Sequence, residues 1–218
     1  MKIFRIIRFI SILVIFFAVG CMVNPTKPPP AKTKPHDFYG PENHYYYFTA
    51  AQVQRKKGNL DRAIVLLQKA IELDEDYSYL QRELATVYLQ NRENEKAIEV
   101  LEGMLQENPN DLKSLIIYGG IKQVRKETDD AIAIYEKILA IDPKQSRIYS
   151  LLGGLYMETG DLERAAEVFN RELVNFPGSY TGHFYLGRVY AKQGKVKEAE
   201  KEFRKALELK PEDRKSVV

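Results

Sequence analysis

The sequence predicts an all-α fold, built as a solenoid of about five helix–turn–helix repeats. Four of the ten prolines stand at a constant spacing of 34 residues, at Pro109, Pro143, Pro177 and Pro211. Between them, apolar residues recur three and four positions apart, as on one face of a helix. Self-similarity at this period is typical of helical repeat arrays. One hairpin cannot bury its apolar face alone, so neighbouring repeats are expected to stack into a superhelix.

The first 20 residues have the layout of a secretory signal peptide. Lys2, Arg5 and Arg8 form a basic start, and an apolar stretch follows over residues 9–19. This stretch is shorter than the ~20 residues that cross a bilayer. The three cations also account for the net charge of +3. The rest of the chain is therefore neutral, and no basic surface for nucleic acid is expected.

Cys21, the only cysteine, follows Gly20 at the end of the apolar stretch. This junction resembles the cleavage box of bacterial lipoproteins, although Ala18 stands where that family favours leucine. The resemblance implies cleavage before Cys21, a lipid on its sulfur and acylation of the new amino terminus, which would hold the protein on a membrane. Met22 follows where an aspartate often marks inner-membrane retention, so the expected location is the outer membrane, facing the periplasm. A plain cleaved signal and an uncleaved anchor beginning near Ile3 are the alternatives.

Residues 21–41 are expected to form a linker between the lipid and the repeats. They hold six of the ten prolines, and their first part has no apolar periodicity. Proline-rich chain favours extended polyproline II at about 3.1 Å per residue, and disorder is the alternative. Either state would hold the repeats away from a lipid surface. The repeat array is expected over residues 42–211, followed by a short tail at 212–218.

The repeat pattern is clearest between residues 180 and 211. Its signature positions are Leu186, Gly187 and Tyr190 in the first helix and Ala199, Phe203, Ala206 and Pro211 in and after the second. This pattern resembles the tetratricopeptide repeat, and it recurs in segments 44–77, 78–111, 112–145, 146–179 and 180–211. The resemblance implies a right-handed superhelix with small residues where helices cross.

Three glycines and two departures from the repeat pattern allow predictions about the turns and about local helix packing. Gly58, Gly160 and Gly194 lie between the two helices of a repeat, where a left-handed residue ends a helix. Lys122 replaces the inner tyrosine of the third repeat, and Glu172 replaces the second-helix alanine of the fourth. Both replacements are expected to alter packing locally without changing the fold.

No enzyme signature is found, so we expect no catalysis, cofactor, metal or small-molecule substrate. His183 occupies a position that is usually aromatic, which favours a packed histidine over a ligand or base. Asp129 and Asp130 are expected to begin a helix, where carboxylates favour the helix dipole. Gly153 lies in a glycine pair without the context of a phosphate loop, and close helix packing is the better interpretation.

In tetratricopeptide proteins the solvent-facing side of each first helix lines a concave groove for a partner. The resemblance places the groove residues at Tyr45, Phe48, Gln52, Tyr79, Arg82, Thr86, Lys113, Ile116, Arg147, Ser150, Phe184 and Arg188, with Thr181 beside them and Gly120 and Gly154 leaving space. The set contains no carboxylate, and it mixes apolar groups with Arg and Lys. It suits an extended peptide with apolar anchors and acidic groups. The carboxylate clamp of chaperone-binding members is not matched, because Glu83 stands at one of its asparagine positions.

The expected function is that of a non-catalytic, membrane-anchored adaptor that binds a protein or an extended peptide. Chains of this design resemble lipoproteins that help assemble secretins, pili or the outer membrane, and others that tether cell-wall hydrolases. Two alternatives stay open. The chain is either an accessory subunit or tether of a periplasmic enzyme, or an uncleaved scaffold anchored in the inner membrane.

Overall fold

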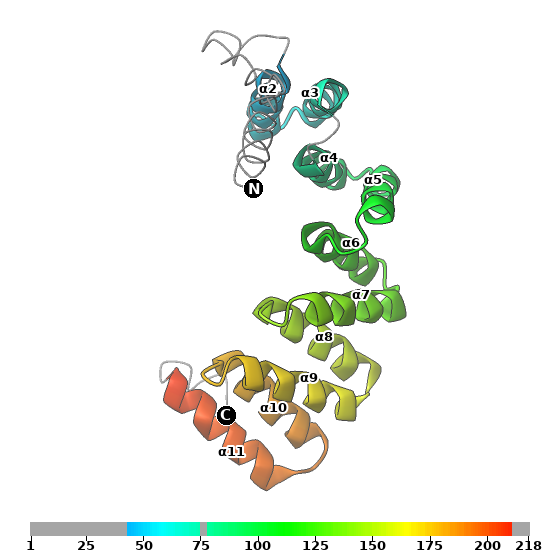
Figure 1. The fold of residues 1–218 in the computed structure, drawn as a ribbon. Helices are drawn as coiled ribbons and strands as arrows, with labels where there is room; N and C mark the ends of the chain where they lie inside the picture. The colour runs from blue at the N-terminus through cyan, green and yellow to red at the C-terminus, as the bar shows by residue number, and fades with distance from the viewer. Residues whose placement is uncertain (1–42, 75–77, 211–218) are drawn as a thin grey trace, which may run out of the picture. The chain divides into compact units, whose positions relative to one another are not determined.

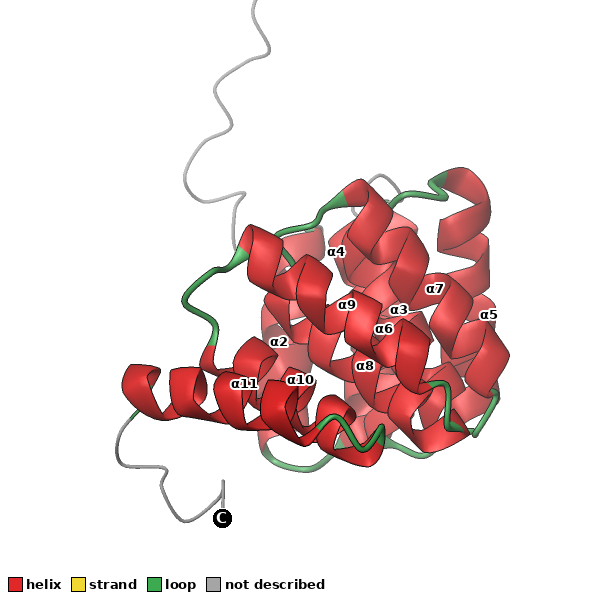
Figure 2. Cartoon of the chain, turned by 90° about the horizontal axis from the view of Figure 1, so that it is seen from below, coloured by secondary structure: helices red, strands yellow, loops and turns green. Residues whose placement is uncertain are grey.

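The computed structural model describes residues 43–74 and 78–210, which form ten helices and no strand (Figures 1 and 2). The signal segment, Cys21 with its linker and the tail lie outside the described residues. The helices are α2 (His44–Lys56), α3 (Leu60–Leu73), α4 (Ser78–Gln90), α5 (Asn94–Glu107), α6 (Leu112–Val124), α7 (Thr128–Ile141), α8 (Ser146–Thr159), α9 (Leu162–Asn175), α10 (Tyr180–Lys192) and α11 (Val196–Leu209).

Each repeat is a hairpin of two helices joined by a short turn. We call the first helix of each hairpin the A helix (α2, α4, α6, α8 and α10) and the second the B helix (α3, α5, α7, α9 and α11). Every helix packs against the next one along the chain, so the hairpins stack in sequence order, as Figure 1 shows. The all-α solenoid predicted from the 34-residue period is confirmed.

Small residues allow the helices of each hairpin to approach closely. The alanine that repeats near the start of each B helix is buried at Ala63, Ala97, Ala131, Ala165 and Ala199. A Cβ atom at Gly187 would lie 2.8 Å from Cδ1 of Phe203, and one at Gly153 would collide with Phe169. Since carbon atoms prefer about 3.5–4.0 Å, only glycine fits at these crossings. Close packing at Gly153 and Gly187 is therefore confirmed.

One left-handed residue occupies the turn between the A and B helices of every repeat. Gly58, Gly160 and Gly194 have φ of 79°, 83° and 75°, as expected. The equivalent residues of the second and third repeats are not glycine: Arg92 has φ of 63° and Lys126 has φ of 60°. A left-handed conformation costs a residue with a Cβ about 1–2 kcal/mol. The shared turn geometry therefore overrides the preference of these two residues.

Lys122 points into a small cluster of charges at the end of α6. Its Nζ lies 2.5 Å from a carboxylate oxygen of Glu127 and 3.2 Å from one of Asp130, and it sits over the ring of Tyr118. The hydrogen bond from Lys122 to Glu127 raises the pKa of the lysine. An ion pair thus takes the place of the tyrosine that the second, fourth and fifth repeats use.

Glu172 is completely buried between α9 and α10. Its Oε1 accepts hydrogen bonds from Ser179 Oγ (2.6 Å) and Thr181 Oγ1 (3.0 Å), whereas Oε2 has no partner in the described part of the chain. Gly182 lies opposite, in a position that holds leucine, serine or isoleucine in the three preceding repeats. A Cβ there would lie 2.8 Å from Cδ2 of Leu173 and 3.4 Å from Cδ of Glu172, which is an ordinary contact distance. The missing side chain of Gly182 therefore makes room chiefly for Leu173, the neighbour of Glu172.

The hydrophobic core consists of two clusters that meet at α6. Leu115 belongs to the cluster that continues through α10, whereas Ile121 belongs to the cluster formed with α2–α5. The junction between the second and third repeats is thus the place where one continuous core gives way to the next.

Candidate functional site

The expected groove residues occupy equivalent positions on the five A helices, and we call this surface the A-helix face. Tyr45, Lys113, Arg147 and Arg188 are exposed, and the other eight are half-buried. Because none is fully buried, all twelve can contact a partner. Their role in binding stays a prediction.

A carboxylate interrupts the A-helix face between α2 and α4. Glu83 Oε2 accepts hydrogen bonds from Gln52 Nε2 at 3.1 Å and from Arg55 Nη1 at 2.8 Å. The sequence reasoning named Glu83 only as the residue that departs from the carboxylate clamp, and it did not name Arg55. A 28-residue separation hides their contact, although it is close to one repeat period.

Arg82 joins α4 to the start of α6. Its Nη1 donates to Asp111 Oδ2 at 2.9 Å, and Asp111 also caps α6 by accepting from the Ser114 amide. Burial acts to raise the pKa of Asp111, but the hydrogen bonds from Ser114 and the charge of Arg82 outweigh it, so the pKa lies below its usual value. Arg82 is therefore already neutralised within the chain.

The A-helix face of the third to fifth repeats carries cations whose surroundings differ from those of Arg82. Among the residues described, no carboxylate lies within ion-pair distance of Lys113, Arg147 or Arg188. The guanidinium of Arg188 instead lies over the rings of Phe184 and Tyr185, at 5.9 and 5.5 Å. These contacts hold the side chain while leaving its N–H groups available for an anionic group.

An apolar cavity of about 430 Å³ opens on the A-helix face where the two core clusters meet. We call it the junction pocket. It is lined by Leu89, Asn94, Ile116, Ile117, Gly120, Ile121, Val124 and Arg125. Of these residues, the sequence reasoning had placed Ile116 and Gly120 on the groove surface.

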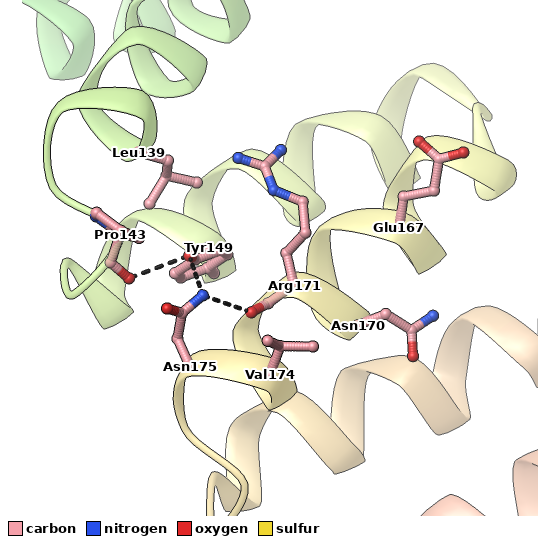
Figure 3. A pocket seen from close by; sticks show the side chains of 8 residues that line it. All are labelled: Leu139, Pro143, Tyr149, Glu167, Asn170, Arg171, Val174 and Asn175. Atoms are coloured by element: carbon pink, nitrogen blue, oxygen red, sulfur yellow. Dashed lines mark hydrogen bonds between the residues drawn. The ribbon is translucent and has the colours of Figure 1, made fainter.

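A second cavity, of about 520 Å³, lies beside α9 (Figure 3). The Tyr149 hydroxyl donates to the Pro143 carbonyl at 3.0 Å, and Asn175 Nδ2 donates to the Tyr149 hydroxyl at 3.0 Å and to the Arg171 carbonyl at 2.9 Å. Val174 is 80% exposed at its edge. The sequence reasoning missed this cavity. The one feature of the sequence that could have indicated it is Val174, which stands where the other repeats carry glutamate, glutamine or alanine.

The candidates for other chemistry have structural roles. His183 is buried, and its Nδ1 lies 2.6 Å from Glu202 Oε2, so the prediction of a packed histidine is confirmed. Asp129 and Asp130 lie in the first turn of α7, as expected. Within the described residues, no cluster of three or more His, Cys, Asp or Glu side chains is arranged to hold a metal.

None of the helices in the described part of the chain combines the length and apolar character needed to cross a membrane. The apolar stretch at residues 9–19 lies outside that part. Its role as a signal therefore stays a prediction.

Comparisons with known proteins agree with this architecture. Two family models of the tetratricopeptide repeat match the chain, one over residues 54–116 and 125–171 and the other over residues 151–214. A crystal structure of MamA is 25% identical with a TM-score of 0.67, covering 80% of this chain and 95% of that one.

Two further solved structures show the same fold. MamA from Desulfovibrio magneticus RS-1 is 20% identical, with a TM-score of 0.65 and coverage of 81% of this chain and 99% of that one. YrrB, described as a TPR protein with an unusual peptide-binding site, is 19% identical, with a TM-score of 0.62 and coverage of 81% and 90%. No curated protein sequence matches the chain.

Proposed function

The chain belongs to the tetratricopeptide-repeat family, and from this premise we propose that it is a scaffold that binds an extended segment of a partner protein along its A-helix face. The observation that carries the proposal is the set of cations on that face that have no carboxylate partner among the described residues. Lys113, Arg147 and Arg188 stand beside apolar and aromatic groups, a combination that favours protein interfaces. The solved structure of YrrB, which has a peptide-binding site, offers a parallel on the same fold.

Site-directed photo-crosslinking in cells tests this proposal. A benzoylphenylalanine introduced at Ser150, on the A-helix face, should capture one main partner. The same group at Lys201, on the exposed side of α11, serves as the control position. Arg147→Glu and Arg188→Glu should abolish the crosslink from position 150 while leaving the far-UV circular dichroism unchanged. Equal capture from both positions, or capture that survives both charge reversals, would place binding elsewhere.

We also propose that lipid on Cys21 anchors this scaffold to the outer membrane, facing the periplasm. The support is the sequence alone: the basic start, the short apolar stretch and Gly20 before Cys21. In this setting the scaffold would serve the assembly of an envelope, pilus or secretion complex. The proline-rich linker would let the A-helix face reach a partner at some distance from the lipid.

Mass spectrometry of the mature amino terminus tests the anchor. Lipoprotein processing predicts an amino terminus at Cys21 that carries acyl chains, and Cys21→Ala should prevent both acylation and cleavage before residue 21. An intact Met1 would show an uncleaved anchor, and an unmodified residue near position 21 would show a plain signal peptide. Membrane fractionation of the wild type then distinguishes the outer from the inner membrane.

A further inference from the structure

The junction pocket departs from the repeat pattern at Val124. This side chain is 84% exposed in the last turn of α6. The equivalent residues of the other four repeats are Lys56, Gln90, Glu158 and Lys192. A single exposed valine is common on protein surfaces. Here, however, it extends the half-buried Ile116 and Ile117 into one apolar strip beside a cavity.

Gly120 keeps the pocket open at the middle of this strip. Apart from the backbone of its own helix, no atom of the described residues lies within 4 Å of the place where its Cβ would stand, so close packing does not explain this glycine. Its equivalents in three other repeats, Gln52, Thr86 and Arg188, carry side chains that project from the same face. The core also changes from one cluster to the other at α6, the helix that supplies most of the pocket lining.

The charges around the pocket indicate what its occupant carries. At the rim, Arg125 is neutralised by Glu95 at 3.2 Å and by Glu127 at 2.7 Å. Lys113 stands in the first turn of the same helix, and Arg147 holds the equivalent position on α8. Neither has a carboxylate partner among the residues described. The pocket itself is therefore neutral, and positive charge lies toward one end of it.

The helix fixes the spacing between these two features. Lys113 precedes Gly120 by seven residues on α6, which corresponds to roughly 10 Å at 1.5 Å per residue. An extended chain covers about 3.3 Å per residue. In an extended ligand that lies along α6, about three residues therefore separate a side chain in the pocket from one that reaches Lys113.

We infer that the junction pocket receives an aliphatic side chain of an extended protein segment, and that an acidic residue three positions away in that segment pairs with Lys113. This inference rests on the proposed function and specifies its ligand. The binding contribution comes from burying the aliphatic group in the cavity. The charge pair fixes the position and direction of the segment along the face.

A peptide selection on the detergent-solubilised full chain tests this inference. Phage-displayed random 12-residue peptides are selected on the protein, and the enriched peptides are synthesised with fluorescein for anisotropy titrations. Enriched sequences should share a Leu, Ile or Val three positions from an Asp or Glu. Replacing that aliphatic residue in the peptide by Ser should weaken binding about ten-fold or more.

Variants of the protein locate the contact. Gly120→Leu fills the pocket and should weaken binding about ten-fold or more. Lys113→Glu should weaken it about five-fold at low salt and less at high salt, because salt screens exposed charges. Gly103→Leu, at another helical glycine with no atom within 4 Å of its Cβ position, is the matched control on a B helix and should bind like the wild type.

The outcomes separate the inference from the proposal beneath it. If no peptide is enriched over a blank surface, binding of an extended segment fails, and the inference fails with it. If enriched peptides bind Gly120→Leu and Lys113→Glu as tightly as the wild type but lose binding to Arg188→Glu, the function stands and the pocket assignment is wrong. Weakening by Gly103→Leu equal to that by Gly120→Leu would also overturn the assignment.

Discussion

The adjacent glycines of α8, Gly153 and Gly154, should respond in opposite directions to the same substitution. A Cβ at Gly153 would lie 2.7 Å from Cε2 and 2.8 Å from Cε1 of Phe169. The ring cannot retreat easily, because it is fully buried and stacks on Tyr185 with centroids 5.3 Å apart. At Gly154, by contrast, the described part of the chain places no atom outside the helix's own backbone within 4 Å of the Cβ position.

The magnitudes follow from these two environments. Overpacking of this kind costs about 1–3 kcal/mol, and alanine recovers up to about 1 kcal/mol through its better helix propensity. With the full propensity gain, Gly153→Ala should therefore lower the free energy of unfolding by up to about 2 kcal/mol. Gly154→Ala has only the propensity gain, so it should raise that free energy by about 0.5–1 kcal/mol.

Urea unfolding followed by far-UV circular dichroism measures both effects on the same day and in the same buffer. The midpoint should fall for Gly153→Ala and rise for Gly154→Ala, with an unchanged slope. If both midpoints rise, helix propensity dominates at both positions. Phe169 would then not press on α8 as the structure describes.

Three further changes test other parts of the chain. Arg92→Gly should raise the free energy of unfolding by about 0.5–1 kcal/mol, because glycine adopts the left-handed turn without a steric cost. Glu172→Gln should stabilise the protein at pH 7 and have little effect near pH 4. Burial raises the pKa of the Glu172 carboxyl in the folded state. The folded wild type therefore loses stability as the pH rises above the unfolded pKa of about 4.3. Arg82→Ala should cost about 1–2 kcal/mol by leaving the half-buried Asp111 without its cation.

Each change has a matched control and a result that would count against it. Lys57→Gly introduces glycine at a residue with φ of −82°, and it should destabilise where Arg92→Gly stabilises. Glu198→Gln removes the same charge from an exposed site of α11, so a similar gain at pH 7 would trace the Glu172 effect to net charge instead of burial. An Arg82→Ala variant as stable as the wild type would show that Asp111 needs only its cap hydrogen bonds.

The fold could be predicted from sequence periodicity because single positions in each repeat determine where its helices end and how closely they pack. Prolines mark the ends of B helices, and Gly153 and Gly187 mark crossings where a Cβ does not fit. These features are local, or they lie one helix apart in the same hairpin. The turn at Arg92 shows the limit of local reasoning, because the surrounding hairpin imposes a left-handed conformation that this residue does not favour.

The surface was harder to predict because its contacts cross from one repeat to the next. Glu83 reaches Gln52 and Arg55, and Arg82 reaches Asp111, over separations of 28 to 31 residues. Which side chains meet depends on how the hairpins are stacked, a quantity that no single repeat encodes. The junction pocket likewise arises from the volumes of residues on two neighbouring repeats, so a list of solvent-facing positions does not reveal it.

These cross-repeat contacts divide the A-helix face into two parts with different capacities. In the first two repeats Arg55 and Arg82 are satisfied by carboxylates of this chain, and an incoming acidic group would have to displace them. In the last three repeats Lys113, Arg147 and Arg188 have no such competitor among the described residues. A composition count treats all five cations alike. Carboxylates of this chain neutralise the cations of the first two repeats. The surface that attracts an acidic segment should therefore extend from α6 to α10, and the junction pocket lies where this surface begins.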